Sequence, residues 1–263
     1  MKAINFSRLK GFTLVELLVV IAIIALLMGI LMPALSRVRA QGKATVCRAN
    51  LKQWGSVFLM YTGDNDGKFH PGYIGKESKW WMEVTKEYYA DNRDLLYCPM
   101  ATKDNDTTNV YGGKYEAWGD WHGYYGSLGL NLWVCNPGPD ITGVGAYNKP
   151  PRYCWRTTNV RRSSEIPLML DSLAFGGLPL NAKDEPLAKV VTETETSLGN
   201  SKISGTGYFC INRHFGFVNC VFLDFSVRQV ALKQLWRLRW HREFDTNEDY
   251  PVWPEWMKGL QGD

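Results

Sequence analysis

The chain has 263 residues, of which 45% are hydrophobic and 21% are charged. This composition is typical of a globular protein, so most of the chain is expected to fold, as one large domain or two small ones. The net charge of +4 is too small and too dispersed to indicate nucleic-acid binding.

The first predicted element is an apolar segment near the N-terminus. Residues 12–32 are long enough for one helical crossing of a hydrocarbon core about 30 Å thick. Lys2, Arg8 and Lys10 precede this segment, so the positive-inside rule places the N-terminus in the cytoplasm and the rest of the chain outside the membrane. A cleavable secretory signal and a plain membrane anchor share this pattern, but neither accounts for the acidic residue Glu16.

Residues 11–16 read GFTLVE, and they resemble the prepilin-type cleavage and methylation signal of type IV pilins and type II secretion pseudopilins. The resemblance implies that a prepilin peptidase cleaves between Gly11 and Phe12 and that the new Phe12 amine is methylated. It also implies that Glu16 meets the terminal amine of a neighbouring subunit and that Pro33 is the helix proline common in this family. In the alternative interpretation, Glu16 extends to the membrane interface without a partner.

The helical pattern continues beyond Pro33 and becomes amphipathic. Proline removes one internal hydrogen bond, so we expect a kink there and not the end of the helix. One apolar stripe then recurs at spacings of three and four residues, which predicts a single buried helix face: Cys47, Leu51, Trp54, Phe58 and Tyr61.

The predicted organisation follows from these patterns. The fold class is α+β and pilin-like, with a long N-terminal helix, transmembrane in its first half and amphipathic in its second, packed on an antiparallel sheet with long loops. The four predicted segments are a leader (1–11), a transmembrane and assembly helix (12–33), its amphipathic continuation (34–62) and an extracytoplasmic β-rich head (63–263).

Within the head, apolar runs and turn signals predict the following elements. These are a short helix near 79–90, a buried strand at 166–172, an exposed excursion at 176–205, two or three antiparallel strands within 207–230 and a short aromatic helix at 235–244.

The segment that ends the long helix, TGDNDG, contains Asp64 and Asp66. It holds only a fragment of the ligand series of a calcium loop, so a solvated turn and a calcium site are the two interpretations. We expect no other metal and no cofactor.

His214 and Asp224 are separated by nine residues and are accompanied by Arg213 and Asn219. This pattern resembles the H-X9-DG motif of prepilin-signal proteins from planctomycete-type bacteria, although Phe225 replaces its glycine and is expected to avoid a positive φ. Without a nucleophile motif or a second metal-ligand residue nearby, a buried polar network that holds the last strands is favoured over catalysis or metal binding.

All six cysteines follow the apolar segment and would therefore lie in an oxidising compartment. The expected disulfides are Cys47–Cys98, Cys135–Cys154 and Cys210–Cys220, and buried free thiols are the alternative.

The predicted function is structural and not enzymatic. The chain is expected to be a single-pass inner-membrane precursor, with its N-terminus cytoplasmic, that assembles into a type IV pilus or a type II secretion pseudopilus. Its expected partners are prepilin peptidase, the membrane and other pilin or pseudopilin subunits, and no nucleic acid. The alternatives are a non-polymerising, membrane-anchored protein that binds glycans through its aromatic residues, and a hydrolase that uses His214 and Asp224.

Overall fold

The computed structural model describes residues 12–72, 79–102, 110–144, 148–184, 186, 205–248 and 252–262. The predicted leader, residues 1–11, lies outside this part of the chain. The chain divides into two compact units, Met1–Gly42 and Lys43–Asp263, and the boundary between them falls within the first helix.

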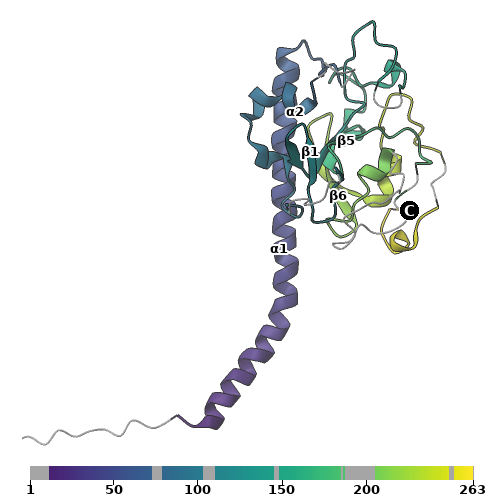
Figure 1. Ribbon diagram of the computed structural model, residues 1–263. Helices are drawn as coiled ribbons and strands as arrows, with labels where there is room; N and C mark the ends of the chain where they lie inside the picture. The colour runs from purple at the N-terminus through teal and green to yellow at the C-terminus, as the bar shows by residue number, and fades with distance from the viewer. Residues whose placement is uncertain are drawn as a thin grey trace, which may run out of the picture. The chain divides into compact units, whose positions relative to one another are not determined.

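Helix α1 (Leu14–Asp64) is the longest element (Figure 1). Pro33 lies inside α1 and does not end it, as predicted. The predicted buried stripe is also confirmed, because all five of its side chains are buried in the second unit: Cys47, Leu51, Trp54, Phe58 and Tyr61.

The core of the second unit is built on a five-stranded sheet with the strand order β5-β3-β4-β6-β7. Three neighbouring pairs are antiparallel, and β5 alone pairs in parallel, with β3. This arrangement confirms the α+β class. The strands are β3 (Leu128–Asn131), β4 (Pro167–Asp171), β5 (Gly176–Gly177), β6 (Phe217–Phe222) and β7 (Val227–Ala231); a separate hairpin pairs β1 (Trp118–Trp121) with β2 (Tyr124–Gly126).

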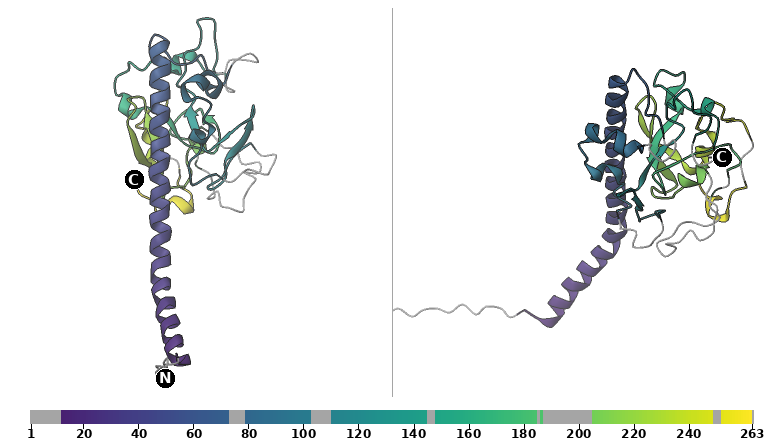
Figure 2. Two further views of the ribbon diagram at one scale, coloured as in Figure 1. Left: turned by 90° about the vertical axis from the view of Figure 1, so that its left-hand side faces the viewer. Right: turned by 45° about the horizontal axis from the view of Figure 1, so that its top comes forward.

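The part of α1 that belongs to the second unit packs against the sheet (Figures 1 and 2). Gly55 faces β6 closely, since a Cβ atom built there would lie 3.2 Å from the Val221 side chain. The Trp54 indole donates a hydrogen bond of 2.7 Å to the Leu95 carbonyl, and the Lys52 ammonium donates one of 3.0 Å to the Phe225 carbonyl. The helix therefore forms one wall of the core.

Short helices fill the connections between these elements. Helix α2 (Trp81–Val84) and the 3-10 helix η1 (Lys86–Tyr89) occupy the position of the short helix predicted near 79–90. The buried strand predicted at 166–172 is confirmed by β4, whose five residues are all buried. The remaining 3-10 helices are η2 (Arg93–Leu96), η3 (Pro151–Tyr153), η4 (Ser163–Glu165), η5 (Gly205–Tyr208), η6 (Leu232–Arg237) and η7 (Glu255–Met257).

One prediction for the head was wrong in detail, and the prediction of two or three antiparallel strands within 207–230 is confirmed by β6 and β7. The segment predicted to be an exposed excursion begins with buried residues, because Gly176 and Gly177 extend the sheet as β5 and Leu178 packs into the core. The rest of that excursion, residues 187–204, lies outside the described residues. The region 207–230 holds two strands, since Gly205–Tyr208 closes a 3-10 turn by hydrogen bonds such as Phe209 N–H to Thr206 O at 3.0 Å.

The turn between β6 and β7 gives a further correction. Phe225 adopts a left-handed conformation with φ of 61°, which the sequence had led us to exclude. The preceding residue, Asp224, stabilises the turn by accepting hydrogen bonds from the Ser226 backbone N–H at 3.0 Å and from its hydroxyl at 2.6 Å. These local bonds offset the cost of about 1–2 kcal/mol for a left-handed residue that carries a side chain.

Candidate functional site

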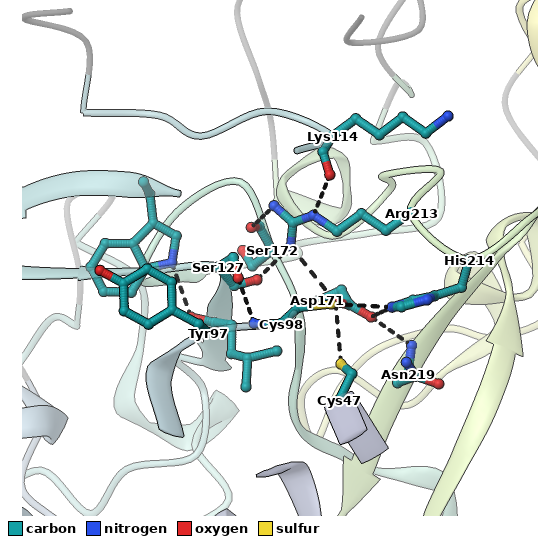
Figure 3. Close-up of polar contacts among 12 residues, drawn as sticks. Cys47, Tyr97, Cys98, Lys114, Ser127, Asp171, Ser172, Arg213, His214 and Asn219 are labelled. Carbon is teal, nitrogen blue, oxygen red and sulfur yellow. Dashed lines mark hydrogen bonds and ion pairs between the residues drawn. The ribbon is translucent and has the colours of Figure 1, made fainter. Parts of the chain in front are cut away.

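A buried polar cluster lies between α1 and the sheet (Figure 3). Its members, defined here as the Cys–Asp–His cluster, are Cys47, Cys98, Asp171 and His214, and one potential ligand atom of each lies within 4.8 Å of the others. Cys47 comes from α1 and Cys98 from the loop after η2, whereas Asp171 ends β4 and His214 lies in the loop before β6. Four separate segments of the second unit therefore meet at one point.

Direct polar contacts connect the members of the cluster. The His214 Nε2 atom lies 3.2 Å from Asp171 Oδ2, and the Cys47 thiol donates to Asp171 Oδ1 at 3.6 Å. The Cys98 Sγ atom lies 3.4 Å from His214 Nε2. The backbone N–H of Asn219 also donates to Asp171 Oδ2, at 2.8 Å, so the carboxylate is the centre of the network.

Arg213 supports the cluster from one side. Its guanidinium group is buried, lies 3.7 Å from Asp171 Oδ1 and donates to four backbone carbonyls. Carbonyl acceptors match the planar fork of donors that an arginine presents. The accepting carbonyls belong to Gly113, Lys114, Ser127 and Ser172, so this side chain joins two loops to the end of β4.

Burial and charge act in opposite directions on the cluster. Burial alone would raise the pKa of Asp171, but His214, Arg213 and the Asn219 amide outweigh it and bring the pKa to about 2. Burial alone would lower the pKa of His214, but the adjacent carboxylate raises it to about 10. Burial raises the pKa of the Cys47 thiol well above its usual range. Burial alone would also raise the pKa of Cys98, but its hydrogen bonds with Cys47 and His214 outweigh this effect and lower the pKa.

The residues of the proposed H-X9-DG motif do not all meet in the structure. Arg213, His214 and Asn219 share the buried network, but Asp224 is exposed in the β6–β7 turn and bonds to Ser226. The carboxylate that contacts His214 is that of Asp171, which the sequence analysis did not single out. Its position was signalled by one feature only, an ionisable residue at the end of an otherwise apolar buried strand.

The second region of interest is the start of α1. Thr13 and Glu16 form a reciprocal capping box: the Thr13 backbone N–H and hydroxyl donate to Glu16 Oε2 at 2.9 and 2.8 Å, and the Glu16 N–H donates to the Thr13 hydroxyl at 3.2 Å. Glu16 therefore stabilises the helix start in the monomer. Gly11 lies outside the described residues, and the Phe12 side chain beside it is 70% exposed.

The helical turns that follow expose an apolar surface. The large apolar side chains from Phe12 to Val38 are 46–77% exposed, and an 18-residue window of α1 has a mean hydropathy of 3.1 with no buried residue. By length and composition, α1 is a candidate membrane anchor. Within this part of the helix, the Ser36 hydroxyl donates to the Pro33 carbonyl at 2.8 Å.

Comparison with known proteins finds two similarities. Residues 7–32 match the family model for the prokaryotic N-terminal methylation motif. The type IV wide pilus major component PilA4 of Thermus thermophilus is 47% identical to the chain over 57 residues, which cover 22% of this chain and 44% of PilA4. The chain is therefore similar, over part of its length, to a type IV pilin.

The similarity covers a limited part of both proteins. The chain matches less than half the length of this pilin relative, and most of the chain lies outside the match. No solved structure is significantly similar to the chain. The head must therefore be interpreted from its own residues.

The acidic residues proposed as a calcium site take part in protein contacts. Asp64 Oδ2 accepts a hydrogen bond of 3.0 Å from the Tyr88 hydroxyl, and Asp66 Oδ2 lies 3.3 Å from the Lys68 ammonium. Asp66 and Gly67 have φ values of 55° and 73°, as expected of a tight turn. Calcium binding by this turn stays a prediction.

All six cysteines are buried and present as thiols in the structure. The sulfur atoms of Cys135 and Cys154 lie 3.3 Å apart, and those of Cys47 and Cys98 belong to the Cys–Asp–His cluster. Cys210 does not lie on a strand beside Cys220; its sulfur instead lies 3.9 Å from that of Met257. The three disulfides stay predictions. The third, Cys210–Cys220, was expected to bridge neighbouring strands, and Cys210 does not lie on a strand.

Most aromatic residues of the head build its core. Trp54, Trp81, Trp118, Trp133, Trp236 and Trp240 are among the largest fully buried side chains. Among the described residues of the second unit, Tyr125 and Phe215 are the large aromatic side chains that are exposed. The predicted aromatic helix at 235–244 is represented by η6, which ends at Arg237 and leaves Trp240 in an extended, buried segment.

Proposed function

We propose that the chain is a structural subunit of a type IV pilus or a type II secretion pseudopilus, held in the inner membrane as a precursor before assembly. Prepilin peptidase cleaves between Gly11 and Phe12, and the Phe12 amine is then methylated. The N-terminus starts in the cytoplasm and the head lies outside the membrane. The observation that carries this proposal is the methylation motif at residues 7–32 at the start of a helix whose apolar side chains are exposed.

The exposed apolar surface requires an apolar environment. A helix that is hydrophobic on all sides is stable when it is surrounded by lipid or by other helices. Before assembly, residues 12–33 would cross the membrane, and after assembly the helices of neighbouring subunits would replace the lipid around them. The head needs no such exchange, since its own core buries its apolar residues.

Glu16 has a defined part in this process. An acidic group in a membrane segment costs roughly 2.5–3.5 kcal/mol at the helix centre, so its retention calls for a partner. In the monomer, Thr13 supplies two donors to Oε2 of Glu16. In the filament, the methylated Phe12 amine of a neighbouring subunit supplies a cation, and this buried pair fixes the register between subunits more than it adds stability.

The experiment that tests this function compares filament formation by the wild-type chain and by Glu16→Ala in a host strain with a type IV pilus assembly system. We expect filaments of the wild-type chain in the sheared surface fraction and a loss of at least tenfold for Glu16→Ala, with both chains processed. Lys258→Ala is the matched control, because the Lys258–Glu255 pair is exposed on the head. Wild-type chains that are processed but stay as monomers in the membrane would contradict the proposal and favour a membrane-anchored binding protein.

A further inference from the structure

The Cys–Asp–His cluster contains the donor set of a structural zinc site. Zinc prefers thiolate, imidazole and carboxylate ligands in a tetrahedral arrangement, and structural sites use four protein ligands. The cluster offers two sulfur atoms, one ring nitrogen and one carboxylate oxygen from four segments of the chain. These residues are nearly inaccessible to solvent, which favours a structural ion over a catalytic one with an open position.

The distances within the cluster fit the edges of a tetrahedron around one ion. Bonds of about 2.3 Å to sulfur and about 2.0–2.1 Å to nitrogen and oxygen give sulfur–oxygen and sulfur–nitrogen edges of about 3.5 Å and a nitrogen–oxygen edge of about 3.3 Å. The observed separations are 3.6 Å between Cys47 Sγ and Asp171 Oδ1, 3.4 Å between Cys98 Sγ and His214 Nε2, and 3.2 Å between His214 Nε2 and Asp171 Oδ2. With one carboxylate oxygen taken from Asp171, the four ligand atoms all lie within 4.8 Å of one another. One ion therefore needs little rearrangement of these side chains.

The charges around the cluster also balance when a dication is bound. Two thiolates and the Asp171 carboxylate carry three negative charges, and a divalent ion with the buried Arg213 guanidinium compensates them. Burial of unbalanced charge is costly, so this balance favours Zn²⁺ in a site closed to water. Arg213 and the Asn219 backbone N–H hold the carboxylate in place, as outer residues of metal sites commonly do.

The Asn219 side chain supplies an independent observation. Both polar atoms of its amide are buried, and neither has a hydrogen-bond partner among the described residues. An unpaired buried polar group destabilises the fold. The Asn219 amide lies beside Cys47 (Figure 3), and a Cys47 thiolate would be a strong acceptor for its N–H group.

We infer that Cys47, Cys98, Asp171 and His214 bind one structural Zn²⁺ ion that fastens α1 to the sheet of the head. On binding, the two thiols and any protonated His214 release their protons, so that all four ligands offer an electron pair to the metal. This use of Cys47 and Cys98 replaces the disulfide that the sequence predicted between them. The inference does not depend on filament assembly, since every ligand lies in one chain.

The test measures metal in the full chain, extracted in detergent with a phosphine reductant, without chelator or affinity tag. We expect about one zinc per chain by mass spectrometry of the metal. After removal of the zinc, added Co²⁺ should give the charge-transfer absorption of thiolate ligands. Cys98→Ala should lose at least tenfold in zinc affinity, whereas Cys220→Ala, which removes a buried thiol outside the cluster, should retain the metal.

The wild-type cobalt spectrum keeps the inference testable if Cys98→Ala fails to fold. A folded, reduced wild-type chain that contains no zinc and gives no thiolate–cobalt absorption would overturn the inference. A metal-free chain with a Cys47–Cys98 disulfide, trapped by alkylation during extraction without reductant, would also overturn it. Because metal is measured on dispersed chains, failure of filament assembly would leave this result unchanged.

Discussion

The start of α1 and the head use apolar residues in opposite ways. From Phe12 to Val38, the large apolar side chains are 46–77% exposed, whereas Cys47, Leu51 and Trp54 further along the same helix are fully buried. The apolar side chains of the first region can be buried only by lipid or by other helices. The second region is closed by the sheet and loops of its own unit.

The two parts of α1 therefore have different roles. None of residues 12–42, the described part of the first unit, belongs to the buried core, and residues 43–64 form a wall of the head. Substitutions in the first region should therefore alter association with membrane or partner while the head stays folded. Substitutions in the second should alter the free energy of unfolding of the head.

The largest expected effect comes from Trp54→Ala. Trp54 is fully buried and packs against Trp81 and Tyr89 with ring centroids 5.0 and 4.9 Å away, so its removal should lower the free energy of unfolding by about 3–5 kcal/mol. Denaturant unfolding of the full chain in detergent, followed by near-ultraviolet circular dichroism, measures this loss.

Leu18→Ala is the matched control for Trp54→Ala. The Leu18 side chain is 54% exposed, so the same measurement should change by less than about 0.5 kcal/mol. Comparable losses at the two positions would show that the proposed division of α1 is wrong.

A second effect depends on pH and comes from His70. Burial lowers the pKa of His70 from 6.5 to about 4, and its Nδ1 atom is buried with no hydrogen-bond partner among the described residues. In the unfolded chain, His70 binds a proton below pH 6.5. In the folded chain, it binds a proton only below about pH 4. The free energy of unfolding should therefore fall by about 3 kcal/mol as the pH drops through this window.

The variant His70→Phe isolates this effect from the other histidines. Between pH 6.5 and 4, its unfolding free energy should decline less steeply than that of the wild-type chain. His122→Gln, at an exposed position, should keep the wild-type slope. Residues 12–42 contain no histidine, so identical slopes for wild type and His70→Phe would place the pH response elsewhere in the head.

The smallest expected effect concerns the motif residue that lies outside the cluster. Asp224→Ala removes the acceptor for two hydrogen bonds from Ser226 in the β6–β7 turn and should cost about 1 kcal/mol. Asp224→Asn should restore most of that stability, because an asparagine oxygen accepts the same bonds. Denaturant midpoints of the two variants provide the measurement, and loss of the cobalt spectrum in Asp224→Ala would show that Asp224 does support His214.

The long helix and the strand β4 could be predicted because their signals are local. The spacing of Cys47, Leu51, Trp54 and later residues defines one helix face, and the short apolar run before Asp171 defines a buried strand. The 3-10 turn at Gly205–Tyr208 could not be predicted, since its glycines and aromatic residues fit a strand equally well. The left-handed Phe225 depends on hydrogen bonds that Asp224 accepts from Ser226, and a residue preference does not reveal them.

The Cys–Asp–His cluster could not be predicted because its residues are distant in the chain. The sequence drew attention to His214 and Asp224, but β6 lies between them. A strand of this length separates its ends by roughly 20 Å at about 3.3 Å per residue. Strand pairing and the packing of α1 instead bring Asp171 and the two cysteines to His214. The spacing of residues along the sequence specifies neither the strand pairing nor the helix packing.

The most direct test of the pilin-like account is the intact mass and N-terminal sequence of the chain extracted from membranes of a host that contains prepilin peptidase. The account predicts a mature chain that begins at Phe12 and carries one methyl group on its terminal amine. A chain that begins at Met1, or at Arg37 after cleavage as an ordinary secretory signal, would contradict it.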